Sequence, residues 1–174
     1  MPTTMSGTFT EIIFARFDVG EDLRLGLMNV IKDKDIKSGV VLSITGALEN
    51  ARLHRFRAVG EPSITTETVE MGGPLEVSGH GIIGQMDAPG FGKTPFGAEG
   101  EFVHQEPYLH VHLTATSAQQ TLCGHLMNGA IVRSLHPTSH FTVVIGRIAG
   151  AGIVMTGEPM PGTKARFGHE LVTL

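Results

Sequence analysis

The sequence predicts an α+β fold, with a mostly antiparallel sheet and one main helix near the N-terminus. Two observations support this. One early stretch has apolar residues at helical spacing, and several later stretches alternate or run apolar as strands do. The chain has 174 residues, a length typical of one domain with its own core. We therefore expect a single domain over 1–174, with a core at about 12–150 and peripheral segments at 1–10 and 151–174.

The predicted elements follow in order along the chain. Residues 11–18 (EIIFARFD) predict a strand, and residues 21–32 predict a helix whose first turn holds two acidic side chains. Residues 39–47 (GVVLSITGA) form a nearly continuous apolar run, which we expect to be a strand buried on both faces. Further strands are predicted at 49–60, 63–71, 75–84, 108–115, 121–127 and 141–150, followed by a surface tail.

Charge and composition argue against several classes of protein. The net charge is −4 and the 13 Lys and Arg are scattered, whereas binding a phosphate backbone needs a concentrated cationic face. Cys123 is the single cysteine, so no internal disulfide can form. The N-terminus lacks a signal-peptide pattern, and the apolar runs are too short to span a membrane. We expect a cytoplasmic protein with neither nucleic acid nor membrane as partner.

Three histidines lie close together in YLHVHLTATSAQQTLCGHL, residues 108–126. His110 and His112 are two apart on a predicted strand and therefore share one face. If 121–127 pairs with that strand, His125 joins the same face across the hairpin. Three imidazoles with an open coordination position are typical of catalytic zinc, and iron, nickel or manganese accept the same ligands. A polar strand face with ordinary hydrogen-bonded histidines is the alternative, and spacing alone leaves both open.

Other residues give weaker signals. GFGKT (90–94) lacks the first glycine of a phosphate-binding loop, so we reject that interpretation. Cys123 sits in a predicted strand, where a cysteine is more often core filler than nucleophile. Glu76 and Arg52 are candidate acid–base and anion-holding groups, although such residues in strands are usually solvated. Histidines that could support the ligands, or simply lie in loops, are His104, His136 and His140.

Several stretches together resemble the PPC domain, a family of plants and prokaryotes. The stretches run from FDVGEDLRLGLMNVIKDKDIKSGVVLSITGALENARLHRF through GPLEVSGHG and PYLHVHL to GHLMNGAIV, within about residues 12–150. The similar features are the Gly-Glu-Asp helix start (20–22), the strand leading into 46–51, the strand 75–78, the H-x-H pair and the Gly-His-Leu turn (124–126). Their order and spacing together make the resemblance fairly specific.

The resemblance implies a domain of antiparallel sheets that assembles as a homotrimer. It also implies a metal, typically zinc, held near a subunit interface by His110, His112 and His125, as in bacterial and archaeal members. The family fold is similar to that of acetolactate decarboxylase, a zinc enzyme with a comparable histidine set. Plant members are labelled DNA-binding because they carry an AT-hook, an Arg-Gly-Arg-Pro segment that this chain lacks. Those plant members lack the histidine set.

Two functional hypotheses follow. In the first, the chain is a metal-dependent enzyme, a lyase or hydrolase, or a binder of a small oxo-acid or carboxylate. The metal would polarise an oxygen or activate water, Arg52 would hold an anionic group, and Glu76 would move a proton. The ligand would sit under the Gly/Pro-rich loop 87–100. In the second, the chain is a trimeric regulatory or DNA-associated module with a structural metal. The charge balance and the histidine spacing favour the first.

Overall fold

The computed structural model describes residues 2–58, 64–89, 103–133, 141–158 and 166–174. Strands dominate these ranges, so the protein is sheet-rich, and the expected single main helix is short. No helix within them is long and apolar enough to cross a membrane. The elements, in chain order, are β1 (Thr8–Phe17), α1 (Leu23–Asp33), β2 (Gly39–Ala58), β3 (Ile64–Asp87), β4 (Pro107–Thr116), β5 (Thr121–Leu126), β6 (Ile131–Val132), β7 (Phe141–Ala149), β8 (Gly152–Glu158) and β9 (Arg166–Val172).

Two pairs of predicted strands are single long strands in the structure. β2 contains both 39–47 and 49–60 as far as Ala58, and β3 contains 75–84 together with most of 63–71. The two strands pair along almost their whole length, with register shifts in place of a break. Glycines and a proline that look like turn signals therefore lie inside strands, where cross-strand hydrogen bonds override local turn propensity.

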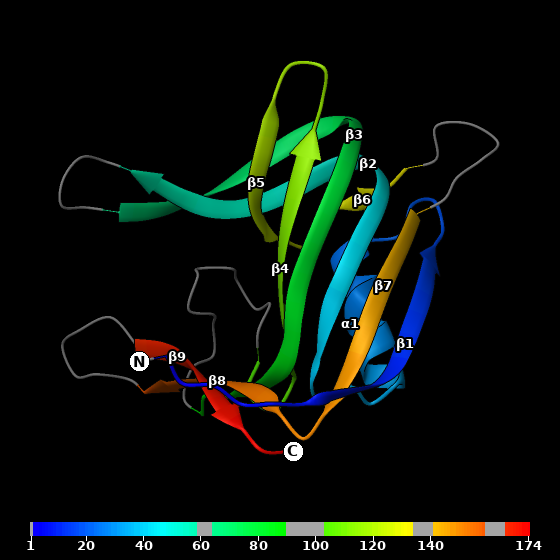
Figure 1. Ribbon diagram of the computed structural model, residues 1–174. Coiled ribbons are helices and arrows are strands. Elements are labelled where there is room, and N and C mark those ends of the chain that lie inside the picture. Colours follow the sequence, from blue (N-terminus) through cyan, green and yellow to red (C-terminus); the bar gives the residue numbers. More distant parts are fainter. Residues whose placement is uncertain (1, 59–63, 90–102, 134–140, 159–165) are drawn as a thin grey trace.

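The strands form one sheet of mixed direction. Its order is β1-β7-β2-β5-β4-β3-β8-β9, with β6 beside β2 and a further pairing of β2 with β3. The pairings β2–β5, β5–β4, β4–β3 and β3–β2 close a ring, and all of them are antiparallel. The far halves of β2 and β3 reach away from the rest of the sheet as an arm, beside β5 (Figure 1). Among the pairings of the described strands, that of β3 with β8 is the only parallel one.

The main core lies between α1 and one face of the sheet (Figure 1). Asp22 caps the helix by accepting a 3.0 Å hydrogen bond from the backbone N–H of Leu25. Leu27 and similar residues of α1 pack in one buried cluster with sheet residues such as Leu113, each contributing about 1.5–3 kcal/mol by burial. On the other face, the C-terminal strands cover the end near Tyr108, whereas the part formed by β1, β7 and the first half of β2 exposes apolar side chains. Leu42 is 44% exposed there, so the prediction that 39–47 is buried on both faces is wrong.

The predicted surface tail is also wrong for its described part. β8 pairs in parallel with the end of β3, and β9 pairs antiparallel with β8. Met155 of β8 is buried together with Met86, Ala88 and Tyr108 in a second, smaller core. The C-terminal segment is thus an integral hairpin at one end of the sheet.

Candidate metal centre

Strand β4 presents two histidines on the open face of the sheet. Leu109, Val111 and Leu113 are buried in the core, while His110 is half-buried and His112 is exposed. This alternation is the period of two that any strand imposes. His125 of β5 stands directly opposite His112, so the predicted hairpin between these strands is confirmed. All three side chains consequently share one face.

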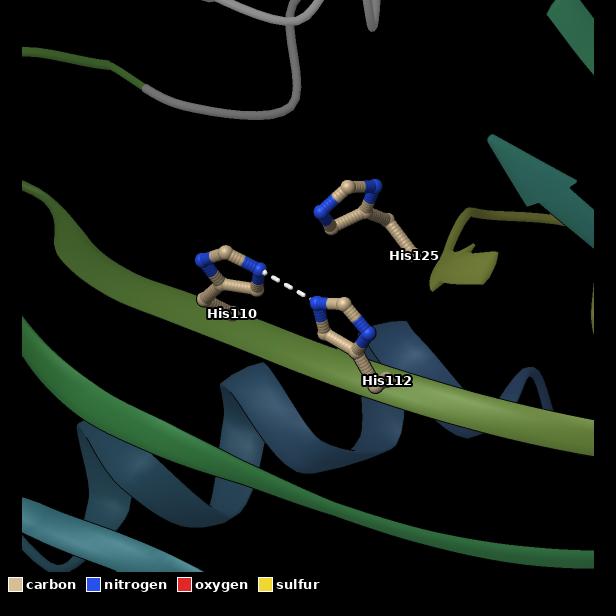
Figure 2. Close-up of side chains that lie close together, drawn as sticks. All are labelled: His110, His112 and His125. Atoms are coloured by element: carbon tan, nitrogen blue, oxygen red, sulfur yellow. Dashed lines mark hydrogen bonds between the residues drawn. The ribbon is translucent and has the colours of Figure 1, made fainter. Parts of the chain in front are cut away.

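The three imidazoles converge on one point (Figure 2). One ring nitrogen from each of His110, His112 and His125 lies within 4.8 Å of the others. The Nε2 atoms of His110 and His112 are 3.1 Å apart. Two nitrogens bound to one tetrahedral zinc are about 3.3 Å apart, given zinc–nitrogen bonds of about 2.0–2.1 Å. The His110–His112 pair therefore already has the spacing of two metal ligands, and the nitrogen of His125 lies close enough to complete the set.

His125 is anchored from the strand beside it. Its Nδ1 donates a 3.0 Å hydrogen bond to the backbone carbonyl oxygen of His54 on β2, the kind of bond that fixes the tautomer and ring orientation of a metal-binding histidine. The close approach of β5 to β2 depends on Gly124, where a Cβ would lie 2.9 Å from that same oxygen. The predicted Gly-His-Leu turn at 124–126 is wrong, because these residues lie inside β5.

His110 is anchored through a buried phenol. Its Nδ1 lies 2.7 Å from the hydroxyl of Tyr108, and that hydroxyl lies 2.9 Å from Nε2 of His169 on β9. Burial raises the pKa of Tyr108 well above its ordinary value, so the phenol stays protonated. Neither residue was predicted from the sequence. Tyr108 carried a signal as the single tyrosine, two residues before His110, whereas His169 carried none.

Electrostatics keeps these imidazoles neutral. Burial lowers the pKa of His110 to about 4, and repulsion from neighbouring histidines acts in the same direction. Burial also lowers the pKa of His112 and of His125. A neutral imidazole is the form that binds a metal, so the site holds its ligands ready at neutral pH.

Two further histidines flank the three. His80 of β3 stands directly opposite His112, and their mutual repulsion contributes to the lowered pKa of His112. His54 of β2 stands directly opposite His125. The result is one cross-strand row of four histidines, in the order His54, His125, His112 and His80. The alternation in LEVSGHG was the signal by which His80 could have been found.

The predicted catalytic residues lie apart from this centre. Glu76 shares the face of His80 but stands opposite Thr116, four residues further along β3, which is about 13 Å. Arg52 stands opposite Glu70 and forms an ion pair with it, with Nε 3.7 Å from a carboxylate oxygen. The catalytic roles of Glu76 and Arg52 stay predictions.

The remaining candidates in the described part of the chain, His104 and Cys123, do not join the three histidines. His104 places its Nδ1 3.5 Å from a carboxylate oxygen of Asp87. Cys123 is exposed on β5, so its interpretation as core filler is wrong. His136, His140 and residues 90–102 of the Gly/Pro-rich loop lie outside the described residues.

Solved structures share this fold at low sequence identity, and no curated protein sequence matches the chain significantly. A metal-containing protein from Archaeoglobus fulgidus aligns with a TM-score of 0.64 and 17% identity, over 88% of this chain and 91% of its own. A plant- and prokaryote-conserved (PPC) protein from Pyrococcus horikoshii gives 0.62 and 17%, over 92% of each chain. A protein from Bacteroides thetaiotaomicron, named as a candidate for DNA binding, gives 0.62 and 17%, over 95% and 98%.

Acetolactate decarboxylase from Bacillus subtilis is more distant. It aligns with a TM-score of 0.46 and 14% identity over 58% of its own length, which carries no argument about the reaction. The family itself follows from the sequence match. Residues 4–135 match the model of the Plants and Prokaryotes Conserved (PCC) domain, which is well over half of the chain. This protein therefore belongs to the Plants and Prokaryotes Conserved domain family.

Proposed function

We propose that this protein holds a divalent transition metal, zinc in the first instance, at His110, His112 and His125, and there binds a small carboxylate or oxo-acid. The convergence of three imidazole nitrogens within 4.8 Å carries the proposal. With the proton of His110 on Nδ1, its Nε2 turns a lone pair toward His112 at 3.1 Å. In the metal-free protein the Nε2–H of His112 can donate to that lone pair, and a bound metal ion would take the place of this proton.

The ligand is proposed from the chemistry that such a centre offers. A metal held by three histidines keeps a position open for water or a ligand oxygen, which it activates as a Lewis acid. His112 is exposed, so a small molecule can reach the centre from the open face. Any turnover would belong to the lyase or hydrolase class. The name of the Archaeoglobus protein, a metal-containing one, agrees with the metal but says nothing about a ligand.

Arg52 is the residue we propose to orient the anionic group. It lies two residues from His54 on β2, about 7 Å along the strand from the histidine row. Its partner Glu70 is exposed, so an incoming carboxylate can compete for the guanidinium. Glu76 lies about twice as far along its own strand from that row, so we assign it the proton-transfer role only for a ligand that extends along β3.

Metal analysis tests the centre directly. Protein purified without a metal-carrying tag should contain about one transition-metal ion per chain. His112→Ala should lose it, whereas His104→Ala, a change at a histidine outside the centre, should keep it. Full occupancy in His112→Ala would sink the ligand assignment. An empty parent, even after zinc is offered, would make the three histidines a polar strand face. Titration of zinc-loaded protein with 2-oxo and 3-oxo acids then tests the ligand class.

Among the described residues, the charges argue against the DNA-associated alternative, although the name of the Bacteroides neighbour agrees with it. The arginines of the β2–β3 arm are paired with acidic side chains, since Arg55 and Arg57 lie 2.7 and 3.7 Å from carboxylate oxygens of Glu67. Paired cations release few counterions on meeting a phosphate backbone. We therefore expect no sequence-specific duplex binding at physiological salt. A tight, sequence-dependent gel shift would reverse this assignment.

We propose also that the chain assembles as a homotrimer through the open face of β1, β7 and β2. Phe14 is 74% exposed on this face, and Phe9 and Leu42 are exposed beside it. Contiguous apolar surface of this kind marks interaction sites in soluble proteins. The face continues to the metal centre, because a direct cross-strand row runs through Ile12, Gly146, Val40, Ile82 and His110.

A further inference from the structure

We infer that His169 and Tyr108 set the tautomer and the orientation of His110, which makes the C-terminal hairpin β8–β9 a working part of the metal centre. This inference rests on the proposed function. The match to the family model ends at residue 135, so it does not include the hairpin. His169 is a positioning residue, because it acts on His110 through the Tyr108 hydroxyl, at distances of 2.9 and 2.7 Å.

One arrangement of the protons, with His169 as the acceptor, gives His110 the tautomer that a metal needs. The Tyr108 hydroxyl carries one hydrogen and lies between two ring nitrogens, Nδ1 of His110 and Nε2 of His169. If His169 accepts that hydrogen, the phenol oxygen is left to accept the Nδ1–H of His110. The Nε2 of His110 then carries a lone pair, on the side where His112 lies 3.1 Å away. Without His169, the hydroxyl loses this acceptor; a hydroxyl that donates to Nδ1 of His110 instead would place the ring proton on Nε2 and block the metal.

Strand pairing holds His169 in place. His169 stands opposite Met155 in the β8–β9 pair, and Met155 stands opposite Met86 in the parallel β3–β8 pair. Met155 and Met86 are buried with Tyr108, whose side chain has 0% exposure. The Tyr108 ring meets the His110 ring edge-on at 84° and the His169 ring at 63°. The hydroxyl is thus fixed in space from both sides.

The alternative is a purely structural bond that helps to dock the hairpin. That role predicts a lower free energy of unfolding when His169 is changed, with unchanged metal binding in the folded protein. A positioning role predicts a change at the metal itself. Partners that orient metal-bound histidines are typically worth about 10–100-fold in metal affinity.

The experiment measures zinc affinity by competition with a chelator and the visible spectrum of the cobalt(II)-substituted protein. Tyr108→Phe removes only the hydroxyl, and His169→Phe removes the ring nitrogens while keeping a slightly larger aromatic ring. His169→Gln restores a side-chain hydrogen-bonding group. Glu170→Gln is the matched control, since its neighbouring side chain contacts Thr156 rather than the centre.

We expect Tyr108→Phe and His169→Phe each to weaken zinc binding by about 10–100-fold and to shift the cobalt spectrum. The double variant should be no weaker than Tyr108→Phe alone, because the inferred route from His169 to His110 runs through the hydroxyl. His169→Gln should recover part of the affinity, and Glu170→Gln should match the parent.

Each failure has a distinct signature. Zinc binding by the parent, with its loss in His112→Ala, would support the proposed function. If His169→Phe then keeps the zinc affinity and the cobalt spectrum of the parent, this inference alone is overturned. Additive losses in the double variant would also overturn it, because His169 would then act by another route. A parent that binds no zinc overturns the proposed function together with this inference. If Tyr108→Phe does not fold, the His169 variants still decide.

Discussion

The backbone carbonyl of His54 accepts the Nδ1–H of His125 at 3.0 Å, which ties the third ligand to a strand 71 residues away in sequence. The bond fixes the His125 ring and places the proton on Nδ1, so that Nε2 is the nitrogen able to bind a metal. The bond forms because β5 lies close to β2 at Gly124, which has no side chain to hold the two strands apart. A Cβ at this position would come within 2.9 Å of the oxygen and 3.1 Å of the Leu53 side chain.

Gly124→Ala should therefore weaken the centre without touching a ligand. The added methyl must push β5 away from β2, at about 1–3 kcal/mol in the free energy of unfolding, and should lower zinc affinity about 10–100-fold. Chelator competition and urea unfolding measure the two effects. Gly72→Ala is the control, because a Cβ there meets open space. Equal zinc affinities in the two variants would show that the approach of β5 does not position His125.

Zinc should stabilise the folded protein. A ligand that binds only the native state at 100 times its Kd raises the free energy of unfolding by about 2.7 kcal/mol. Thermal unfolding with added zinc or with a chelator measures the difference. His112→Ala should show almost none of it, since one of the three nitrogens is missing. An equal shift in that variant would place the stabilising zinc elsewhere.

Acid should destabilise the metal-free protein through His110. Its pKa is lowered from 6.5 to about 4 in the folded state, so between these values the unfolded chain binds the proton and the folded chain does not. The contribution of neutral His110 to the free energy of unfolding is therefore complete above pH 6.5. It is lost progressively as the pH drops toward about 4. Urea unfolding across this range measures the slope. His110→Asn should reduce the slope, and an unchanged slope would assign it to other groups.

Phe14→Asp should dissociate the proposed trimer. The side chain is 74% exposed on the open face of β1, so a charge there opposes burial against a second copy while leaving the core untouched. Light scattering coupled to size exclusion reports the mass. Val19→Asp is the control, because Val19 is 59% exposed but lies beyond the end of β1. A parent that runs as a monomer would remove the assembly proposal.

Glu76→Gln and Arg52→Gln separate metal binding from ligand binding. Neither residue is among the three with nitrogens within 4.8 Å, so both variants should keep the zinc content of the parent. Arg52→Gln should weaken binding of an oxo-acid to the zinc-loaded protein, because the cation that we propose for its carboxylate is gone. Calorimetric titration measures that affinity. Unchanged affinity would end the proposed role of Arg52.

The sequence by itself determined the hairpin and the face that carries the ligands. A period of two over YLHVHL puts His110 and His112 on one side of β4, and a short turn brings His125 onto the same side. These are local properties, since strand alternation and hairpin closure need only neighbouring residues. The same logic misjudged β2 and β3, where pairing between distant residues carries each strand through its glycines.

The partners that orient the ligands were decided only by the tertiary structure. The carbonyl of His54 lies 71 residues from His125, and His169 lies 61 residues from Tyr108. No periodicity links such pairs. They meet because β5 closes onto β2 and because the C-terminal hairpin docks against β3, where Met155 is buried beside Tyr108. Strand pairing and burial over the whole chain, rather than any local pattern, bring these groups together.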